Sequence, residues 1–106
     1  MKARRAAVAG MFYPADTAVL ERTVAELLAA APASSDGAKA IIAPHAGYQY
    51  SGLTAAHAYR LLEGRRSMIR RVVLLGPAHR VYLRGMALPS TDTFTTPLGN
   101  VPIDTD

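Results

Sequence analysis

The fold is decided by residues 40–52, which read AIIAPHAGYQYSG. The stretch opens with a continuous apolar run at 40–43, and such a run is typical of a strand buried on both faces of a parallel sheet. A turn-rich segment with His45 follows, and residues 53–62 then have the spacing of a helix that ends near Gly64. The stretch therefore predicts a strand, a histidine-bearing loop and a helix, in that order.

A second apolar run comes after the predicted helix. Residues 72–75 read VVLL and are followed by GPAH, which ends at His79. Two such strands around one helix form a βαβ unit, in which the strands are parallel and the loops after them leave the same edge of the sheet. Open α/β sheets bind their ligands at that edge. We therefore expect His45 and His79 to lie close together.

The rest of the chain adds one clear helix and weaker signals. From Asp16 to Ala31 the apolar residues follow a 3.6-residue period, and Asp16 is placed as the N-cap. Residues 85–89 are a candidate third strand, and the chain beyond them shows only weak periodicity. The predicted fold class is α/β, with a mostly parallel sheet flanked by helices.

The composition excludes several classes of protein. The 106 residues are 50% hydrophobic and 19% charged, which is ordinary for a globular chain. No apolar run reaches the roughly 18–20 residues of a membrane-spanning helix, and the basic opening lacks the long apolar region of a secretion signal. We therefore expect a cytoplasmic protein without a membrane partner.

Cysteine content and charge narrow the chemistry further. There is no cysteine, so disulfides, thiolate metal sites and thiol nucleophiles are excluded within these residues. The net charge of +4 comes mainly from arginines at 65–71 and from the basic opening. Aromatic residues do not alternate with these arginines as they do on platforms that stack nucleic-acid bases, so we expect no nucleic-acid partner.

The histidine pair has two interpretations. Neutral imidazoles are good ligands for iron, copper and zinc, and a histidine pair with one carboxylate leaves coordination positions open for a substrate or for oxygen. On spacing alone, His45 and His79 are more simply polar loop residues bonded to nearby backbone, but the glycine, proline and tyrosine residues around both favour a binding site. Asp92, Asp104 and Asp106 are the carboxylates that could complete it, and their spacing selects none of them.

Other polar side chains near these loops also allow two interpretations. Tyr48 and Tyr50 could donate hydrogen bonds to a bound anion or oxygen species, although half-buried packing is the commoner role of such tyrosines. Ser51 is expected to cap the helix rather than to act as a nucleophile. His57 lies one helical turn from Leu53, and this apolar stripe favours a structural histidine over a catalytic one.

Short motifs across nearly the whole chain carry a resemblance to a known family. They are AGMFYP at 9–14, AIIAPHAGY at 40–48 with YSG at 50–52, AAHAY at 55–59, LGPAH at 75–79 and TPLG at 96–99. In this order and with this spacing, the sequence resembles the Memo family, whose bacterial and archaeal members are often described as AmmeMemoRadiSam system protein B. The combination is highly specific.

The resemblance implies an α/β fold related to that of the class III non-haem iron dioxygenases. It implies that His45 and His79 stand at two of the metal-site histidines, with iron or copper as the cofactor. In a complete protein the metal would bind oxygen or a phenolic substrate, with Tyr48 or His57 assisting proton transfer. Redox or dioxygenase-like chemistry is therefore implied for the complete protein, and weak metal binding without turnover for this chain alone.

The resemblance also implies what this chain lacks. Family members are much longer, so residues 1–106 are expected to be the N-terminal portion of a single Memo-like domain, without the part that would supply a third metal ligand. A sheet that lacks strands exposes an unpaired edge, and we expect self-association through it. Other family members act as interaction proteins that recognise phosphorylated peptides. The alternative function is therefore a non-enzymatic module that binds a peptide, a small molecule or an anion in the same crevice.

Overall fold

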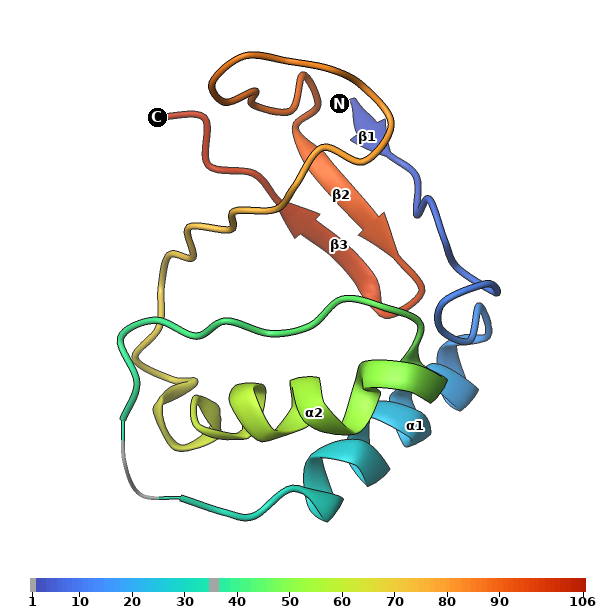
Figure 1. Cartoon of the computed structure of the whole chain (residues 1–106), viewed down its shortest axis with the longest axis vertical. Coiled ribbons are helices and arrows are strands. Elements are labelled where there is room, and N and C mark those ends of the chain that lie inside the picture. Colours follow the sequence, from blue (N-terminus) through green and yellow to red (C-terminus); the bar gives the residue numbers. More distant parts are fainter. Residues whose placement is uncertain (1, 35–36) are drawn as a thin grey trace.

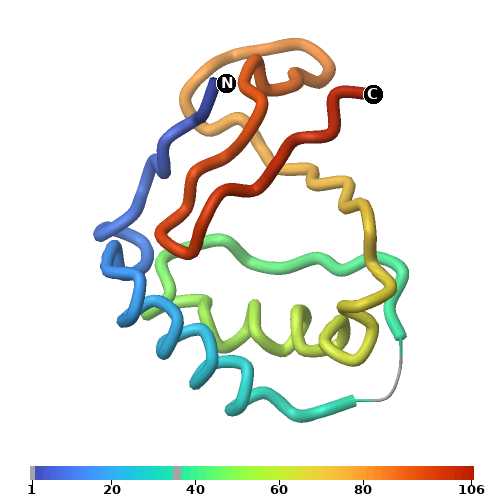
Figure 2. Tube along the Cα trace, turned by 180° about the vertical axis from the view of Figure 1, so that it is seen from behind, coloured from blue at the N-terminus to red at the C-terminus, as the bar shows by residue number. Residues whose placement is uncertain are grey.

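The computed structural model describes residues 2–34 and 37–106. Its helices and strands, in chain order, are β1 (Ala3–Arg4), α1 (Thr17–Ala30), α2 (Tyr48–Arg60), the short 3-10 helix η1 (Glu63–Arg65), β2 (Thr93–Thr96) and β3 (Gly99–Pro102). The two long helices pack side by side at one end of the molecule, and the sheet lies at the other end (Figure 1). Extended chain passes between these two layers, as the view from behind also shows (Figure 2).

Helix α1 forms where the sequence predicts it. Asp16 is the N-cap, and its Oδ1 accepts a hydrogen bond from the N–H of Val19 at 2.9 Å. This bond satisfies one of the N–H groups that a helix leaves unpaired at its start. The helix buries Leu20 and ends shortly before Pro32, which cannot continue it. The prediction of this helix and of its cap is confirmed.

Helix α2 begins earlier than predicted. Its first residue is Tyr48, and Gly47 is the N-cap. The N–H of Tyr48 donates to the carbonyl of Phe12 at 2.8 Å, so a tertiary contact sets the start of the helix. The predicted capping role of Ser51 is wrong, because this residue lies inside the helix and its hydroxyl donates to the carbonyl of Ala46 at 3.2 Å.

The two helices approach closely at Gly52. A Cβ atom at that position would lie 3.1 Å from Cδ1 of Leu27 on α1, so a larger residue would push the helices apart. Near the other end of α2, Arg60 donates from Nη1 to the carbonyl of Leu28 at 2.7 Å and pairs through Nε with Glu63 at 2.8 Å. A small residue at one end and an arginine at the other therefore fix how the helices pack.

The sheet has the order β1-β2-β3, with β1 parallel to β2 and β2 antiparallel to β3. Gly99 opens β3 with a φ of +130°, and its carbonyl accepts a hydrogen bond from Oγ1 of Thr96 at 2.8 Å. The α/β class is confirmed, but the sheet is mixed rather than mostly parallel. Its strands come from the two ends of the chain and not from the predicted βαβ unit.

The predicted strands at 40–43, 72–75 and 85–89 are not strands in the structure. A strand needs a neighbour for its backbone groups, and among the described residues no backbone hydrogen bond joins the first two runs to another segment. Ile42 is 99% exposed and Val73 is 88% exposed, so neither run is buried. The two runs still follow the same direction, as a parallel pair would (Figures 1 and 2).

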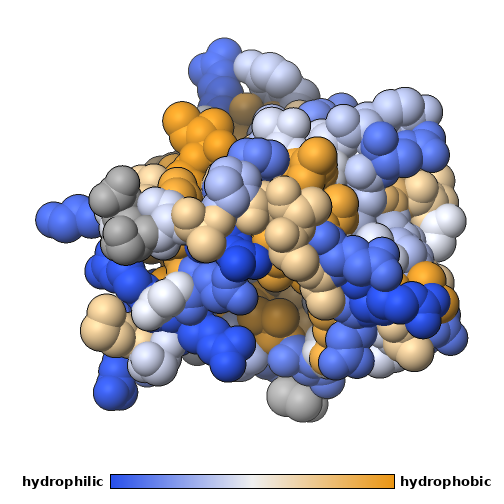
Figure 3. All heavy atoms as spheres, turned by 90° about the horizontal axis from the view of Figure 1, so that it is seen from below, coloured by the Kyte–Doolittle hydropathy of each residue, from blue (hydrophilic) through white to orange (hydrophobic). Residues whose placement is uncertain are grey.

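The core is small for a chain of this length. Leu20, Ala31 and Ala56 are the buried apolar residues of the described chain, and Thr93 is buried in the sheet. The accessible surface is 8998 Å², whereas a folded monomer of this mass exposes about 5,700 Å². Apolar atoms reach the surface between hydrophilic ones on the face seen in Figure 3. Within the described residues, no helix has the length and apolar character needed to cross a membrane.

Candidate functional site

His45 and His79 lie side by side. Their Nε2 atoms are 3.1 Å apart and their ring centroids 5.3 Å apart, and both residues are exposed. At this distance one neutral imidazole donates a hydrogen bond to the other. The sequence predicts this proximity, although the two apolar runs that lead to the histidines are not paired as strands.

The loop that carries His45 is held by a turn at the N-terminus. Gly10 has a φ of +82°, and the N–H groups of Met11 and Phe12 both donate to the carbonyl of Val8, which folds this segment into a tight turn. A Cβ at Gly47 would lie 3.7 Å from the backbone of Phe12, so loop and turn are in close contact. The AGMFYP motif therefore supports the histidine site without supplying a ligand to it.

Two of the three carboxylates considered as a third ligand, those of Asp92 and Asp104, are engaged elsewhere. Asp92 accepts a hydrogen bond from the N–H of Lys2 at 2.8 Å. Asp104 pairs with Nε of Arg71 at 3.3 Å and accepts the N–H of Asp106 at 3.1 Å. Across residues 2–34 and 37–106, no three histidine or carboxylate side chains are grouped so that they could hold a metal ion. The site consists of two imidazoles.

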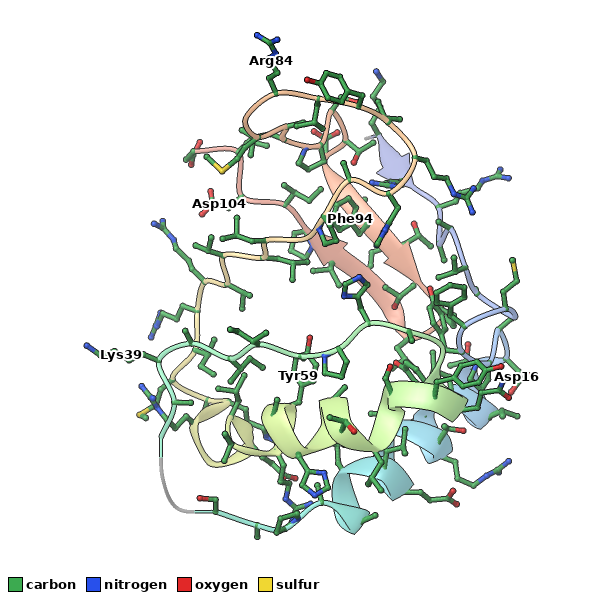
Figure 4. All side chains as sticks on the ribbon, viewed as in Figure 1. Asp16, Lys39, Tyr59, Arg84, Phe94 and Asp104 are labelled. Atoms are coloured by element: carbon green, nitrogen blue, oxygen red, sulfur yellow. The ribbon has the colours of Figure 1, made fainter. Side chains whose placement is uncertain are left out.

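A cavity of about 530 Å³ adjoins His45. It lies between α1, α2 and residues 44–46, and its walls are mostly aliphatic and aromatic. Tyr13, Tyr48 and Tyr59 also line it, and Tyr59 extends from α2 toward the extended chain above that helix (Figure 4). A mostly apolar cavity of this size with a few polar groups is typical of sites for small molecules. Sequence patterns miss Tyr13 and Tyr59, because tertiary packing brings Tyr13 from the N-terminal turn and Tyr59 from α2 to the same cavity.

Tyr48 is half-buried beside this cavity. Its ring lies 5.7 Å from that of Tyr13, measured between centroids. Burial raises the pKa of the Tyr48 phenol above its ordinary value, and the nearby phenols of Tyr13 and Tyr59 raise it further. The phenol therefore keeps its proton at neutral pH and can donate a hydrogen bond into the cavity.

The two remaining candidate residues, Tyr50 and His57, are both exposed. Tyr50 is 79% exposed, so it is not one of the half-buried packing residues that such loops usually contain. His57 is exposed, and its Nδ1 is 2.8 Å from the carbonyl oxygen of Leu53, which makes Nδ1 the donor. The ring is therefore held against its own helix, and Nε2 is the nitrogen left to exchange a proton.

Fold and site together define a small α/β domain that presents two adjacent histidines from extended segments. The family described as Memo-like protein matches residues 4–106, and the chain belongs to this family.

Individual relatives are much longer than this chain. It is 45% identical to Protein MEMO1 of Xenopus tropicalis over 101 residues, which are 95% of this chain and 33% of that protein. It is 43% identical to Protein MEMO1 of Homo sapiens with the same coverage. The identity to Protein memo-1 homolog of Caenorhabditis elegans is 40%, over 28% of that protein. The chain thus spans about a third of the length of the MEMO1 proteins that it matches.

Proposed function

We propose that this chain contributes His45 and His79 as two imidazole ligands of an iron or copper site. The observation that supports the proposal is the separation of 3.1 Å between their Nε2 atoms. Metal–imidazole distances are about 2.0–2.1 Å for zinc, so two nitrogens bound side by side to one ion lie roughly 3 Å apart. The pair therefore fits a shared metal ion without a large rearrangement.

The residues around the pair have separate roles in this proposal. When bound, iron or copper would supply open coordination positions and a Lewis-acid or redox centre. His45 and His79 hold the ion, and Tyr48 keeps a proton on its hydroxyl at the adjacent cavity. His57 is the second candidate for proton transfer, through Nε2. A third ligand comes from outside the described residues, so the chain alone binds metal weakly and has no turnover.

Metal binding by the chain tests this function. We expect the untagged protein to bind Fe(II) or Cu(II) in calorimetry with near one-to-one stoichiometry, and replacement of both His45 and His79 by alanine to abolish that binding. His57→Ala is the matched control, because it also removes one exposed imidazole but should leave metal binding unchanged. Equal binding by the double variant and the original chain would exclude this site.

A second function is supported by the cavity. The imidazoles already satisfy one another by a hydrogen bond, and the cavity beside His45 has the size of a ligand site. In this alternative the chain is a binding module for a peptide, a small molecule or an anion. Binding of a phosphorylated peptide that persists in EDTA favours the module, whereas binding that EDTA abolishes favours the metal site.

A further inference from the structure

The connection that follows α2 carries a dense group of positive charges. We call residues 65–71, which read RRSMIRR, the basic turn. Arg66, Arg70 and Arg71 are exposed, and Arg65 is half-buried. Cations so close together create a local positive field that attracts anionic partners. The basic turn is therefore a candidate binding surface.

The backbone of the basic turn has a defined shape. The N–H groups of Met68 and Ile69 both donate to the carbonyl of Arg65, at 2.9 and 3.2 Å. These two bonds close residues 65–69 into one tight turn. Because the backbone is already ordered, binding a partner here would cost less conformational entropy than binding to a flexible loop.

Lys39 lies beside the basic turn. Nη1 of Arg65 donates to the carbonyl of Ala38 at 3.2 Å, which joins the turn to the residue just before Lys39. The side chain of Lys39 is exposed and points away from the ribbon on the side where α2 ends (Figure 4). Lys39 therefore adds a fifth positive charge to the same surface.

Carboxylates of the chain leave most of these charges unpaired. Glu63 precedes the turn in the sequence but pairs with Arg60. Arg71 pairs with Asp104 at 3.3 Å, and an exposed pair of this kind contributes little to stability and opens easily. Three cations of the surface have no ion pair within residues 2–34 and 37–106: Lys39, Arg66 and Arg70.

Two apolar side chains lie between the arginines. Met68 is 64% exposed and Ile69 is 37% exposed. A lipid membrane with anionic headgroups suits both kinds of side chain, because arginine binds the headgroups while apolar side chains enter the boundary with the acyl chains. A nucleic acid suits this surface less well, since residues 60–71 contain no aromatic side chain on which a base could stack.

We propose that the basic turn and Lys39 form a docking surface for an anionic lipid membrane. The cations contact headgroup phosphates and carboxylates, and Met68 enters the boundary of the acyl chains. Such a contact requires no spanning helix, and none is found within the described residues. The expectation of no membrane partner considered only spanning segments and secretion signals, and the proposal replaces it. The inference does not depend on the proposed metal site.

Cosedimentation with lipid vesicles tests the proposal. The 106-residue chain is mixed in EDTA with vesicles of phosphatidylcholine alone, or with vesicles of equal parts phosphatidylcholine and phosphatidylserine. We expect a partition coefficient at least about tenfold higher on the anionic vesicles. Raising the salt concentration to about 1 M should release most of the bound chain, because the Debye length falls to about 3 Å.

Two double variants with the same net charge test the position of the arginines. Replacement of both Arg66 and Arg70 by glutamine should lower the partition coefficient at least about tenfold. Replacement of both Arg80 and Arg84 by glutamine is the matched control, because these exposed arginines lie outside the basic turn. The control should bind nearly as strongly as the original chain.

A methionine pair tests entry into the bilayer. Met68→Gln should lower the partition coefficient about threefold or more, because it removes an apolar side chain from the boundary of the acyl chains. Met86→Gln is the matched control at a methionine that is 87% exposed outside the basic turn. Circular dichroism of each variant checks that the helices are retained.

Several results would overturn the proposal. Equal partition to neutral and anionic vesicles is one, and binding that persists in high salt is another; neither needs a variant. Equal weakening by the two double arginine variants would show that net charge alone explains the binding. If Met68→Gln binds as strongly as Met86→Gln, the basic turn holds anions without entering a bilayer, and the membrane is excluded as its partner.

Discussion

Tyr48 connects three parts of the molecule at the scale of one residue. Its N–H donates to Phe12 in the N-terminal turn, its ring packs against Tyr13, and its phenol lines the cavity beside His45. The first residue of α2 therefore links the start of a helix to the proposed site. A substitution at this position should therefore change both the free energy of unfolding of the chain and its dependence on pH.

The raised pKa of Tyr48 makes stability depend on high pH. Burial disfavours the phenolate, so the folded state holds the proton more tightly than the unfolded state, where the pKa is about 10. This contribution is fully present below about pH 10 and is lost as the pH rises through the folded-state pKa. In urea unfolding between pH 8 and 11, we expect Tyr48→Phe to reduce the loss of stability at high pH. Tyr50→Phe, at an exposed tyrosine, is the control, and an equal reduction in both variants would contradict the expectation.

Sequence order was enough to predict that the histidines meet but not what surrounds them. His45 and His79 each follow an apolar run, and a crossover helix between two such runs brings their ends together. Tyr59 on α2 and Tyr13 in the N-terminal turn reach the same cavity only through tertiary packing, which no local pattern encodes. The pair was therefore predictable, and its aromatic surroundings were not.

At the scale of secondary structure, local signals were reliable and non-local ones were not. Helix α1 needs its own periodicity and the Asp16 cap, and both are visible in the sequence. A strand at 40–43 also needs a neighbour, which the described residues do not provide. The β2–β3 hairpin was missed because short runs rich in threonine have little hydrophobic alternation, although the TPLG segment is a recognisable turn.

The hairpin should depend on Gly99. Its φ of +130° lies where side chains rarely fit, so Gly99→Ala should lower the free energy of unfolding by about 1–3 kcal/mol. Gly76→Ala is the matched control, because that glycine has no positive φ and an added Cβ meets no atom within 4 Å. Chemical denaturation of both variants measures the difference. Equal stability of the two would show that the backbone at position 99 relaxes without strain.

The whole molecule is expanded for its length. Its radius of gyration is 14.8 Å, whereas about 13 Å is usual for a folded chain of this size. Both the accessible surface area and the radius of gyration indicate that the two helices and the sheet bury few apolar side chains. The chain therefore has the secondary structure of a domain without the amount of buried surface that a domain usually has.

This shape predicts a small heat capacity of unfolding. A typical folded chain of 106 residues gives about 1.3–1.6 kcal/mol/K, because unfolding exposes its core. Much of the apolar surface here is already exposed, so we expect a value below about 1 kcal/mol/K in calorimetry. A value in the usual range would show that the apolar runs at 40–44 and 71–76 are covered in solution.

Strand β1 has a consequence for the order of folding. It contains two residues, and the adjacent N–H of Lys2 bonds to Asp92, 90 positions later. During synthesis on the ribosome, α1 and α2 can pair once residue 60 has emerged, whereas β1 must wait until residues 93–96 of β2 have emerged. Closing so long a loop is entropically unfavourable and slow. Residues 3–4 are therefore made before both helices but reach their place in the sheet only after the helices can pair.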